Sequence, residues 1–552
     1  MSTMNKLKTK VSDYFSDSIN KYRFLTMVLF ILVITLLAWQ SDDAYHAYAM
    51  AKNLVDGNGF VYNIGERATA SSCPLFTLVV AFGYLFCRHM FIVSLLICII
   101  FSAAAYGIIV HRFCKDKKQI FAAFFTLLCS SSFISYTTSG LENSMLFFLA
   151  ALFLSRYFDR EKYDAKNMLY MAILISLIAM TRMDAVLMFI PMILYVYLAK
   201  RDNVSFVKAV GIGTLGLSPF VIWELFSLFY YGFFVPNTAF VKLGTNIPKH
   251  DYIVRGCQYV FNTLICDPIV LFIPFIAVVL LVFTKKYKYI HLALGVLLYG
   301  IYVIYIGGDF MMGRHFTVMF LMSVIGLVYF TNNELINTDT GLVEYRTLGS
   351  RLIKAVIICG VVYSLTTNVI STQFEFGENF NSPISDERGT YFKWTSLFNN
   401  VISYANTGHM CITSAWNDQG VRELMDADLD SGILKVVPGI TKYDHNDMYL
   451  NDFYALGDPY LSKLPAVYEP GWRIGHMYRE APEGYCESVM FGGNEIRNDA
   501  ASEYYDVIRL ITRGDLFDKT RLKAIIDINL GKYDYLIDEY RATLDENNRQ
   551  HE

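Results

Sequence analysis

Long apolar runs alternate with short polar connections over the first two thirds of the chain. Most runs are close to the length that a helix needs to cross the hydrocarbon core of a bilayer, and the shorter ones would need tilt or local thinning. In chain order the runs cover residues 24–39, 91–110, 120–136, 145–158, 168–180, 186–198, 207–229, 269–283, 290–306, 316–330 and 352–370. The pattern therefore predicts a mainly α polytopic membrane protein with about eleven transmembrane helices.

Two parts of the chain break this pattern. Residues 75–86 are apolar but too short to cross a bilayer comfortably, so we expect an interfacial helix there. Residues 373–552 hold no further run of spanning length, and their mixed composition is rich in Tyr, Asp and Gly. We expect short strands and loops around 410–414 and helices over 499–511 and 520–544. The predicted organisation is a transmembrane domain over 1–371, with its first loop at 40–90, and a C-terminal α/β soluble domain over 372–552.

The positive charges of the connections predict an orientation. Basic residues precede the first run and recur in every second connection, at 112–118, 156–166, 200–208, 285–288 and 346–354. The alternate connections hold few cations, notably Arg182 and Arg314. Because Lys and Arg are retained on the cytoplasmic side, we expect a cytoplasmic N-terminus and a C-terminal domain on the outer face. The first run is too long for a signal-peptide core and is interpreted as a retained anchor.

The composition supports this class of protein. Hydrophobic residues make up 54% of the 552 residues and charged residues only 18%, which is apolar for a soluble domain. A formal net charge of −3 argues against nucleic acid as a main partner. None of the ten cysteines shows the spacing of a zinc site. Cys257 with Cys266, and Cys411 with Cys486, could form disulfides on an oxidising outer face.

Polar residues gather on the expected outer face. Asp42 and Asp43 directly follow the first run, where two adjacent carboxylates are costly unless they serve a function. The other outer connections contribute further polar residues: Asn63, Glu66, Arg67, Glu142, Asn143, Arg182, Asp184, Asn237, Lys242, Asp309, Arg314 and His315. A polar cluster on one side of apolar helices predicts a cavity at the outer leaflet, open to lipid and to water.

The residue types in this cluster favour sugar transfer. Carboxylates can accept a hydroxyl proton or bind sugar hydroxyls, and cations can stabilise a departing phosphate. Structural roles are the alternative for each residue. Arg182 could simply pair with Asp184, Glu142 could cap a helix that starts near Asn143, and Arg314 could pair only with Asp309. His315 could be a packed interfacial histidine.

These residues also carry a resemblance to a known family. The first-loop segments 42–45, 51–59 and 61–67 resemble the first outer loop of bacterial GT-C glycosyltransferases, most of all the terminal β-(1→2)-arabinofuranosyltransferases of mycobacteria and corynebacteria. Segments 139–143, 236–242 and 308–314 are similar to later motifs of that group, as are 456–459, 464–465 and 472–476 in the C-terminal part. One departure is Arg182-Met183-Asp184, where the group carries Arg-Pro-Asp.

The resemblance implies a multi-pass enzyme of the bacterial cytoplasmic membrane with a periplasmic C-terminal domain. Its donor would be a polyprenyl-phosphate sugar, with arabinofuranose as the expected sugar, and its acceptor a hydroxyl of an envelope glycan or glycoconjugate. Asp42 or Asp43 would be the catalytic carboxylate, and Lys242, Arg182, Arg314 and His315 would bind the donor phosphate. The expected substrate-binding residues are Arg67, Glu142, Asn143, Asp184, Asn237, Asp309, Trp472, Arg473 and His476. No cofactor is expected, and no divalent metal is demanded because the leaving group carries a single phosphate.

Three other functions fit parts of the sequence. A lipid-sugar transporter would place polar groups at mid-membrane on broken helices and would show an internal repeat, and we see no clear repeat. A same-fold enzyme could use another lipid-linked sugar or a protein acceptor. An envelope-binding scaffold would leave the membrane carboxylates unexplained.

Overall fold

The computed structural model describes residues 14–332 apart from 244 and 246, and residues 383–413, 433–435, 439–467 and 472–551. The predicted span at 352–370 lies outside these residues. The described part is mostly helical, as predicted. Its strands, β1 (Ile433–Lys435) and β2 (Tyr449–Asn451), form one parallel pair with Ile433 opposite Tyr449.

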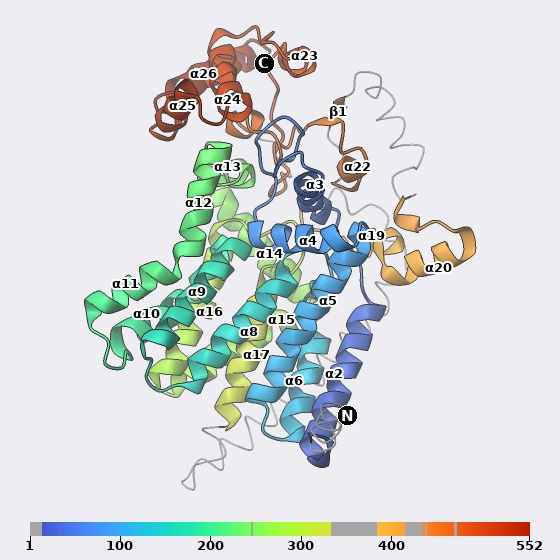
Figure 1. The fold of residues 1–552 in the computed structure, drawn as a ribbon, viewed down its shortest axis with the longest axis vertical. Coiled ribbons are helices and arrows are strands. Elements are labelled where there is room, and N and C mark those ends of the chain that lie inside the picture. The colour runs from blue at the N-terminus through green and yellow to red at the C-terminus, as the bar shows by residue number, and fades with distance from the viewer. Residues whose placement is uncertain are drawn as a thin grey trace, which may run out of the picture.

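A bundle of apolar helices makes up the lower part of the molecule in Figure 1. Its helices are α2 (Ser18–Leu36), α5 (Met90–Ile108), α6 (Lys117–Cys129), α8 (Asn143–Asp159), α9 (Ala165–Thr181), α10 (Ile190–Ala199), α11 (Phe206–Gly216), α12 (Ser218–Tyr231), α14 (Lys249–Cys266), α15 (Ile269–Phe283), α16 (Tyr287–Tyr305) and α17 (Phe316–Phe330). Short turns join some of them: the π-helix η1 (Ile109–Phe113), α7 (Ser131–Ser135) and the 3₁₀ helix η2 (Met183–Met188).

Three of these described segments are long and apolar enough to cross a membrane: α2, α5 with η1, and α16. The count becomes five if each of two bent pairs is one span, α11 with α12 at 51° and α14 with α15 at 106°. The continuous run at 207–229 forms two helices and not one. Pro219 stands in the first turn of α12, where its ring and missing N–H interrupt the continuation of α11. The structure therefore describes a helical protein suited to a membrane, and eleven spans remain a prediction.

Helix α4 (Pro74–Phe86) is the segment predicted to lie at the interface. In Figure 1 it runs across the upper ends of the bundle helices and not along them. Leu85 and Phe86 are more than half exposed, whereas Phe76 and Val80 are buried against the bundle. This orientation agrees with an interfacial helix, which exposes one apolar face without crossing the bilayer.

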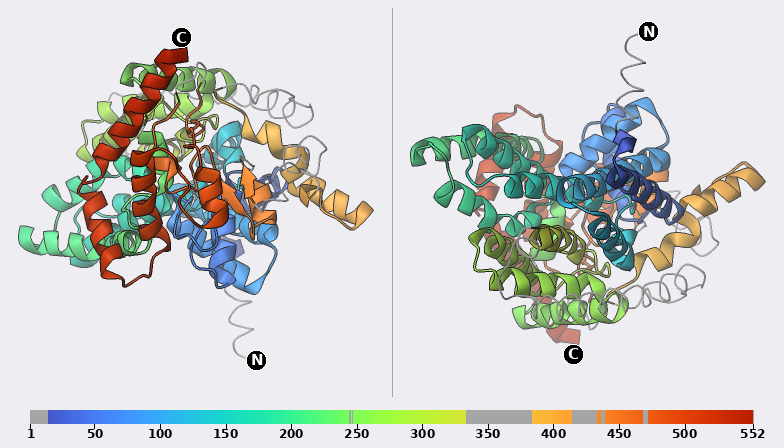
Figure 2. Two further views of the ribbon diagram at one scale, coloured as in Figure 1. Left: turned by 90° about the horizontal axis from the view of Figure 1, so that it is seen from above. Right: turned by 90° about the horizontal axis from the view of Figure 1, so that it is seen from below.

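The C-terminal part lies at the end of the bundle opposite the N-terminus (Figures 1 and 2). It contains α19 (Glu387–Thr395), α20 (Leu397–Thr407), η5 (Cys411–Thr413), α22 (Gly439–Asp444), η6 (Leu461–Lys463), α23 (Tyr485–Phe491), α24 (Asp499–Arg513), α25 (Lys519–Asn529) and α26 (Asp534–His551). The helix at 499–511 is confirmed as α24. The other two expectations are met only in part. Residues 411–413 form a 3₁₀ turn, and the single helix over 520–544 is divided at Gly531, which takes a positive φ of 77°.

The first loop joins the bundle to the C-terminal part. It contains α3 (Ala44–Val55), and the side chain of Asn63 both accepts from the backbone N–H of Leu450 and donates to its carbonyl, each at 3.0 Å. Glu66 pairs with Arg513 at 3.1 Å and accepts from the hydroxyl of Tyr449 at 2.7 Å. These contacts hold the loop at a defined position above the bundle.

Both disulfide expectations are corrected. Cys257 and Cys266 lie nine residues apart in the single helix α14, a separation of roughly 13 Å along its axis that no disulfide can bridge. The thiol of Cys411 contacts the carbonyl of Trp394, and that of Cys486 accepts from the Asn451 amide. No disulfide joins Cys257 to Cys266 or Cys411 to Cys486.

Candidate functional site

A cavity of about 440 Å³ lies where the bundle, the first loop and the C-terminal part meet. The lower wall comes from the ends of α9 and α16 and from one side of α12, and the upper wall from α3, α13 (Asn237–Leu243) and residues 474–476. Most of the predicted outer motifs contribute to its lining. Its charged and imidazole side chains are Asp43, His46, Glu142, Arg182, Asp184, Glu224, Lys242, Lys249, Arg314, His315 and His476.

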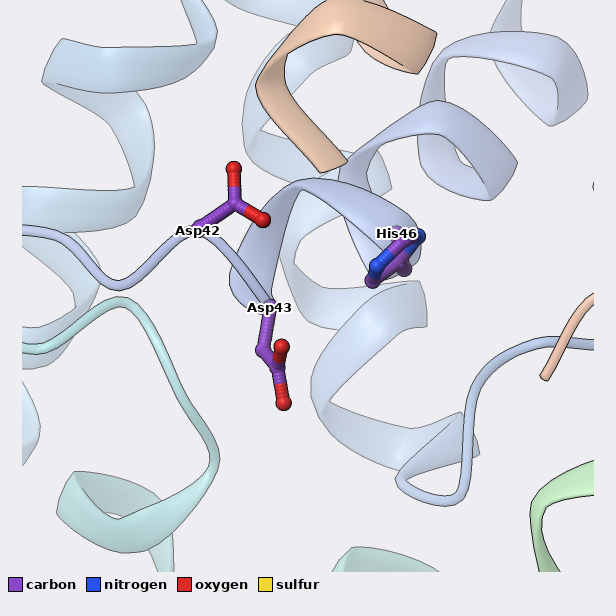
Figure 3. A group of neighbouring side chains, drawn as sticks. All are labelled: Asp42, Asp43 and His46. Atoms are coloured by element: carbon purple, nitrogen blue, oxygen red, sulfur yellow. The ribbon is translucent and has the colours of Figure 1, made fainter. Parts of the chain in front are cut away.

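The two carboxylates after α2 have different surroundings. Asp42 is buried, and its oxygens accept from the backbone N–H groups of Gly439 at 2.8 Å and Ile440 at 3.1 Å, the first residues of α22. Asp43 lines the cavity, and its side chain accepts no hydrogen bond from the described residues. Figure 3 shows the two carboxylates pointing in different directions. The structure therefore separates the pair: Asp42 holds α22 in place and Asp43 faces the cavity.

His46 completes a small cluster with these carboxylates. One ligand atom from each of Asp42, Asp43 and His46 can be chosen so that all lie within 4.8 Å of one another, a spacing that a cation would fit. However, both oxygens of Asp42 already accept backbone hydrogen bonds, and His46 Nδ1 lies 2.6 Å from the hydroxyl of Tyr62. The groups left to hold a cation are the Asp43 carboxylate and His46 Nε2, which is a small set for an Mg²⁺ or Ca²⁺ site.

A buried ion network forms the floor of the cavity. Glu142 pairs with Arg182 at 3.1 Å and with Arg314 at 2.9 Å, and Arg182 also pairs with Asp184 at 2.9 Å. Burial would raise the pKa of Glu142, but the two guanidinium groups outweigh it and hold the pKa below its ordinary value. Glu142 does not use its side chain to cap α8, so the capping alternative is wrong. The two arginines thus reach the cavity already partly neutralised.

His315 sits inside this network. Its ring lies 3.0 Å from Arg182 and from the hydroxyl of Tyr299, and its Nε2 lies 3.5 Å from Asp309. Burial, together with Arg182 and Arg314, lowers the pKa of His315 well below its ordinary value. A neutral imidazole can accept from Arg182 but adds no positive charge. Its placement fits a positioning role better than direct phosphate binding.

Lys242 differs from the two arginines. It projects from α13 into the cavity, and none of the described carboxylates forms an ion pair with it. Its side chain runs past Gly475, where an added Cβ would lie 3.4 Å from Lys242 Cε. Lys249 also lines the cavity, with its ammonium 4.6 Å from the ring centre of Tyr305. Among Lys242, Arg182 and Arg314, Lys242 is therefore the cation whose charge is least neutralised by carboxylates.

The C-terminal residues predicted for the site have separate positions. His476 lines the cavity, and its ring meets Phe310 edge-on at 4.5 Å. Arg473 lies behind it, stacked over Phe310 at 4.4 Å, and its guanidinium donates a hydrogen bond to Glu387 at 3.1 Å. Trp472 packs with Ile247, Tyr252, Ile474 and Met477 in a small hydrophobic cluster, so its role is structural packing.

Arg67, Asn143 and Asn237 do not line the cavity. Arg67 donates to the backbone carbonyls of Ile511 and Gly514 at the end of α24, so it anchors the first loop. The amide of Asn143 lies beside Arg314 and donates to Thr317. Asn237 is buried at the start of α13. The substrate-binding prediction for these three is not supported by their positions, although Asn143 supports a residue that lines the site.

Several residues of the site were missed from the sequence. His46 lies one helical turn after Asp43, a spacing that could have indicated a shared face. Glu224 lies within a long apolar run, where a lone carboxylate is a recognisable signal. Glu387 offered no such signal because only the fold brings it beside Arg473. Burial and the nearby Asp43 carboxylate raise the pKa of Glu387 to about 8, so it is largely protonated at neutral pH.

Comparison of the chain with models of known protein families, and with the sequences of characterised proteins, gives no match.

Proposed function

We propose that the protein is a membrane glycosyltransferase that uses a polyprenyl-phosphate sugar. The sugar, arabinofuranose by the family resemblance, would pass to a hydroxyl of an envelope glycan or glycoconjugate. The observation that carries the proposal is that Asp43 and Lys242 line the same cavity. The Asp43 carboxylate accepts no hydrogen bond from the described residues, whereas Asp42 is held by backbone N–H groups, and no described carboxylate forms an ion pair with Lys242. A base and a phosphate-binding cation are the two groups that such a transfer requires.

In the proposed reaction, Asp43 accepts the proton of the acceptor hydroxyl as its oxygen attacks the anomeric carbon. The bond between that carbon and the phosphate oxygen breaks, and polyprenyl phosphate leaves with the electron pair. Lys242 would stabilise the charge that develops on this phosphate, supported by the partly neutralised Arg182 and Arg314. His476 lines the same upper wall as Lys242 and would contact the acceptor. This direct displacement inverts the anomeric carbon.

The proposal includes an orientation in the bacterial cytoplasmic membrane. The pattern of basic connections supports a cytoplasmic N-terminus, about eleven spans and a periplasmic C-terminal part. A lipid-linked donor then accounts for a site on the outer face, where nucleotide sugars are not supplied. The bilayer, the lipid-linked donor and the envelope acceptor are the proposed partners.

The direct test uses the full chain in lipid nanodiscs. Polyprenyl-phosphate pentoses and hexoses are supplied as donors with an envelope glycan fraction as the acceptor, and release of polyprenyl phosphate is measured by mass spectrometry. We expect release by the wild type and by Lys523→Ala, a control that removes an exposed lysine on α25, and little release by Asp43→Asn. No release from any donor, together with no saturable binding of polyprenyl phosphate, would overturn the proposal. A deletion strain should accumulate the lipid-linked sugar and lack that sugar in its envelope glycans.

A further inference from the structure

Helix α20 (Leu397–Thr407) carries an exposed apolar face that the proposed reaction does not use. Phe398, Val401, Ile402 and Tyr404 are 55%, 56%, 43% and 60% exposed. Positions 398, 401, 402 and 405 follow the spacing of one helical face, and Tyr404 lies at its edge. Asn399, Asn400 and Ser403 occupy the other side, and the helix has no charged residue. The helix is therefore amphipathic and uncharged.

The opposite face of α20 is already occupied. The side-chain amide of Asn400 donates to the carbonyls of Trp394 and Ser396, and its oxygen accepts from the backbone N–H of Ile412. These bonds fix the rotation of the helix about its axis. The apolar face is consequently turned away from the protein and toward the surroundings.

The height of α20 along the bundle identifies what surrounds it. The backbone N–H of Leu397 donates to the carbonyl of Ala38 at 2.9 Å, just beyond the end of α2. α2 is one of the helices suited to cross a membrane, and it exposes an apolar stripe that includes Leu32 and Leu36, each 51% exposed. That stripe ends where α20 begins. A helix that leaves the bundle at this point enters the boundary between hydrocarbon and headgroups.

The direction of α20 agrees with this location. In Figure 1 it extends sideways from the bundle at about the height of α4, and Figure 2 shows it projecting outward in both views along the bundle. The half-buried Trp394 and the exposed Lys393, whose ammonium lies 5.5 Å from the Trp394 ring centre, precede it in α19. Trp and Lys are typical of the interfacial region.

We infer that α20 is a second in-plane membrane helix, which inserts Phe398, Val401 and Ile402 into the outer leaflet on the side of the bundle away from the cavity's α12 wall. The ligand is the lipid surface itself. Because α20 is uncharged, insertion would depend on apolar burial and not on anionic headgroups. The inference depends on a membrane location for α2 but not on sugar transfer.

Membrane attachment of α20 would also brace the site. Helix α19 directly precedes α20 and presents Glu387 to Arg473. The neighbouring Ser385 exchanges backbone hydrogen bonds with Phe310 and Met312 at 2.8 and 3.1 Å. A helix fixed in the leaflet would thus hold the segment that supports Phe310 and, through it, His476.

The test places a photoreactive benzoylphenylalanine at single positions of the full chain in nanodiscs of zwitterionic phosphatidylcholine. After illumination, lipid adducts are measured by mass spectrometry at Phe398, Val401 and Ile402. Asn399 and Ser403 serve as controls on the other face, and Leu32 of α2 as the positive control. We expect adduct yields at the three apolar positions close to that at Leu32 and several-fold above those at the two controls.

Each other outcome overturns the inference. Cross-links from Phe398 to a second copy of the chain would mean that an oligomer covers the face. Lipid adducts no more frequent than at Ser403 would mean that the face does not reach the leaflet. Only variants that elute as the wild type does are compared, and substitution at the three exposed apolar positions should leave folding intact. Adducts at Leu32 in the same preparation verify that the chain is in the bilayer.

Discussion

At the scale of single residues, we expect different effects from substituting the two adjacent carboxylates: loss of turnover at Asp43 and loss of stability at Asp42. Asp43→Asn should leave the fold intact and lower turnover by roughly 100- to 10,000-fold, because one general base contributes about that much. Asp42→Asn replaces an acceptor of two backbone N–H groups and should mainly loosen α22. Donor turnover and thermal unfolding midpoints of both variants would be measured together. Equal loss of turnover without loss of stability in Asp42→Asn would contradict this division of roles.

The phosphate contact belongs to the same scale. Lys242→Ala should cost on the order of 1.5–3 kcal/mol of donor binding, the range for a charge-assisted contact, or roughly 10- to 150-fold in affinity. Lys242→Arg should retain part of the binding. Affinity for polyprenyl phosphate in nanodiscs is the measurement. Lys249 lines the same cavity, so the control is Lys523→Ala, which removes an exposed lysine. Unchanged affinity in Lys242→Ala would shift the phosphate site toward Arg182 and Arg314.

Glu387 gives a prediction about pH. Its pKa is raised from 4.5 to about 8 by burial and by Asp43, so between those values the unfolded chain releases a proton that the native protein keeps. The free energy of unfolding therefore decreases as the pH rises between these values, by at most about 1.4 kcal/mol per pH unit. Glu387→Gln removes the penalty while keeping hydrogen-bonding groups for Ser385 and Arg473. The thermal unfolding midpoint of Glu387→Gln, measured relative to that of the wild type, should rise from pH 5 to pH 8. The same difference for Glu487→Gln, at an exposed position, should stay constant. A difference in midpoint between Glu387→Gln and the wild type that decreases as the pH rises would contradict the prediction.

At the scale of elements, the sequence predicts apolar helices better than their breaks. The runs at 269–283 and 316–330 coincide with α15 and α17, because a long, mainly apolar run can satisfy its backbone polar groups in a membrane only as a helix. The runs at 186–198 and 207–229 are each broken, and Pro191 and Pro219 were the available signals. Helix α14 was missed altogether, since its polar face hides it from a hydropathy pattern. The outer motifs predicted the residues of the carboxylate–arginine floor. The contact of Arg473 with Glu387 could not be predicted, because it joins segments far apart in the sequence.

The joint between α12, α24 and α25 depends on one buried arginine. Arg521 donates to the carbonyls of Phe229, Tyr230, Ile511 and Leu516 at 2.8 to 3.0 Å. Arg521→Met should lower stability by at least about 1.5–3 kcal/mol and expose the turn at 514–518 to protease. Limited proteolysis with mass analysis would detect the cut, and Lys523→Met on the same helix is the matched control. Equal resistance in both variants would mean that apolar packing alone holds the joint.

At the scale of the whole molecule, the arrangement gives the membrane orientation a structural consequence. The N-terminus and the C-terminal helices lie at opposite ends of the bundle (Figure 1). If the bundle crosses the bilayer, these two ends face different compartments. The polar cavity lies near the C-terminal end, so its compartment is the one that the C-terminal part occupies. The basic connections then decide which compartment that is.

Reporter fusions test this orientation directly. An alkaline phosphatase, which is active only outside the cytoplasm, should be active when fused after Glu552 and inactive when fused after Lys118 or Lys286. A green fluorescent reporter at the same three positions should give the complementary pattern, which controls for expression. Phosphatase activity at Lys118 and Lys286 with none at Glu552 would invert the orientation. The cavity would then face the cytoplasm, where nucleotide sugars are available, and the argument for a lipid-linked donor would lose its support. The same activity at all three positions would instead mean that the bundle does not cross the bilayer as a unit.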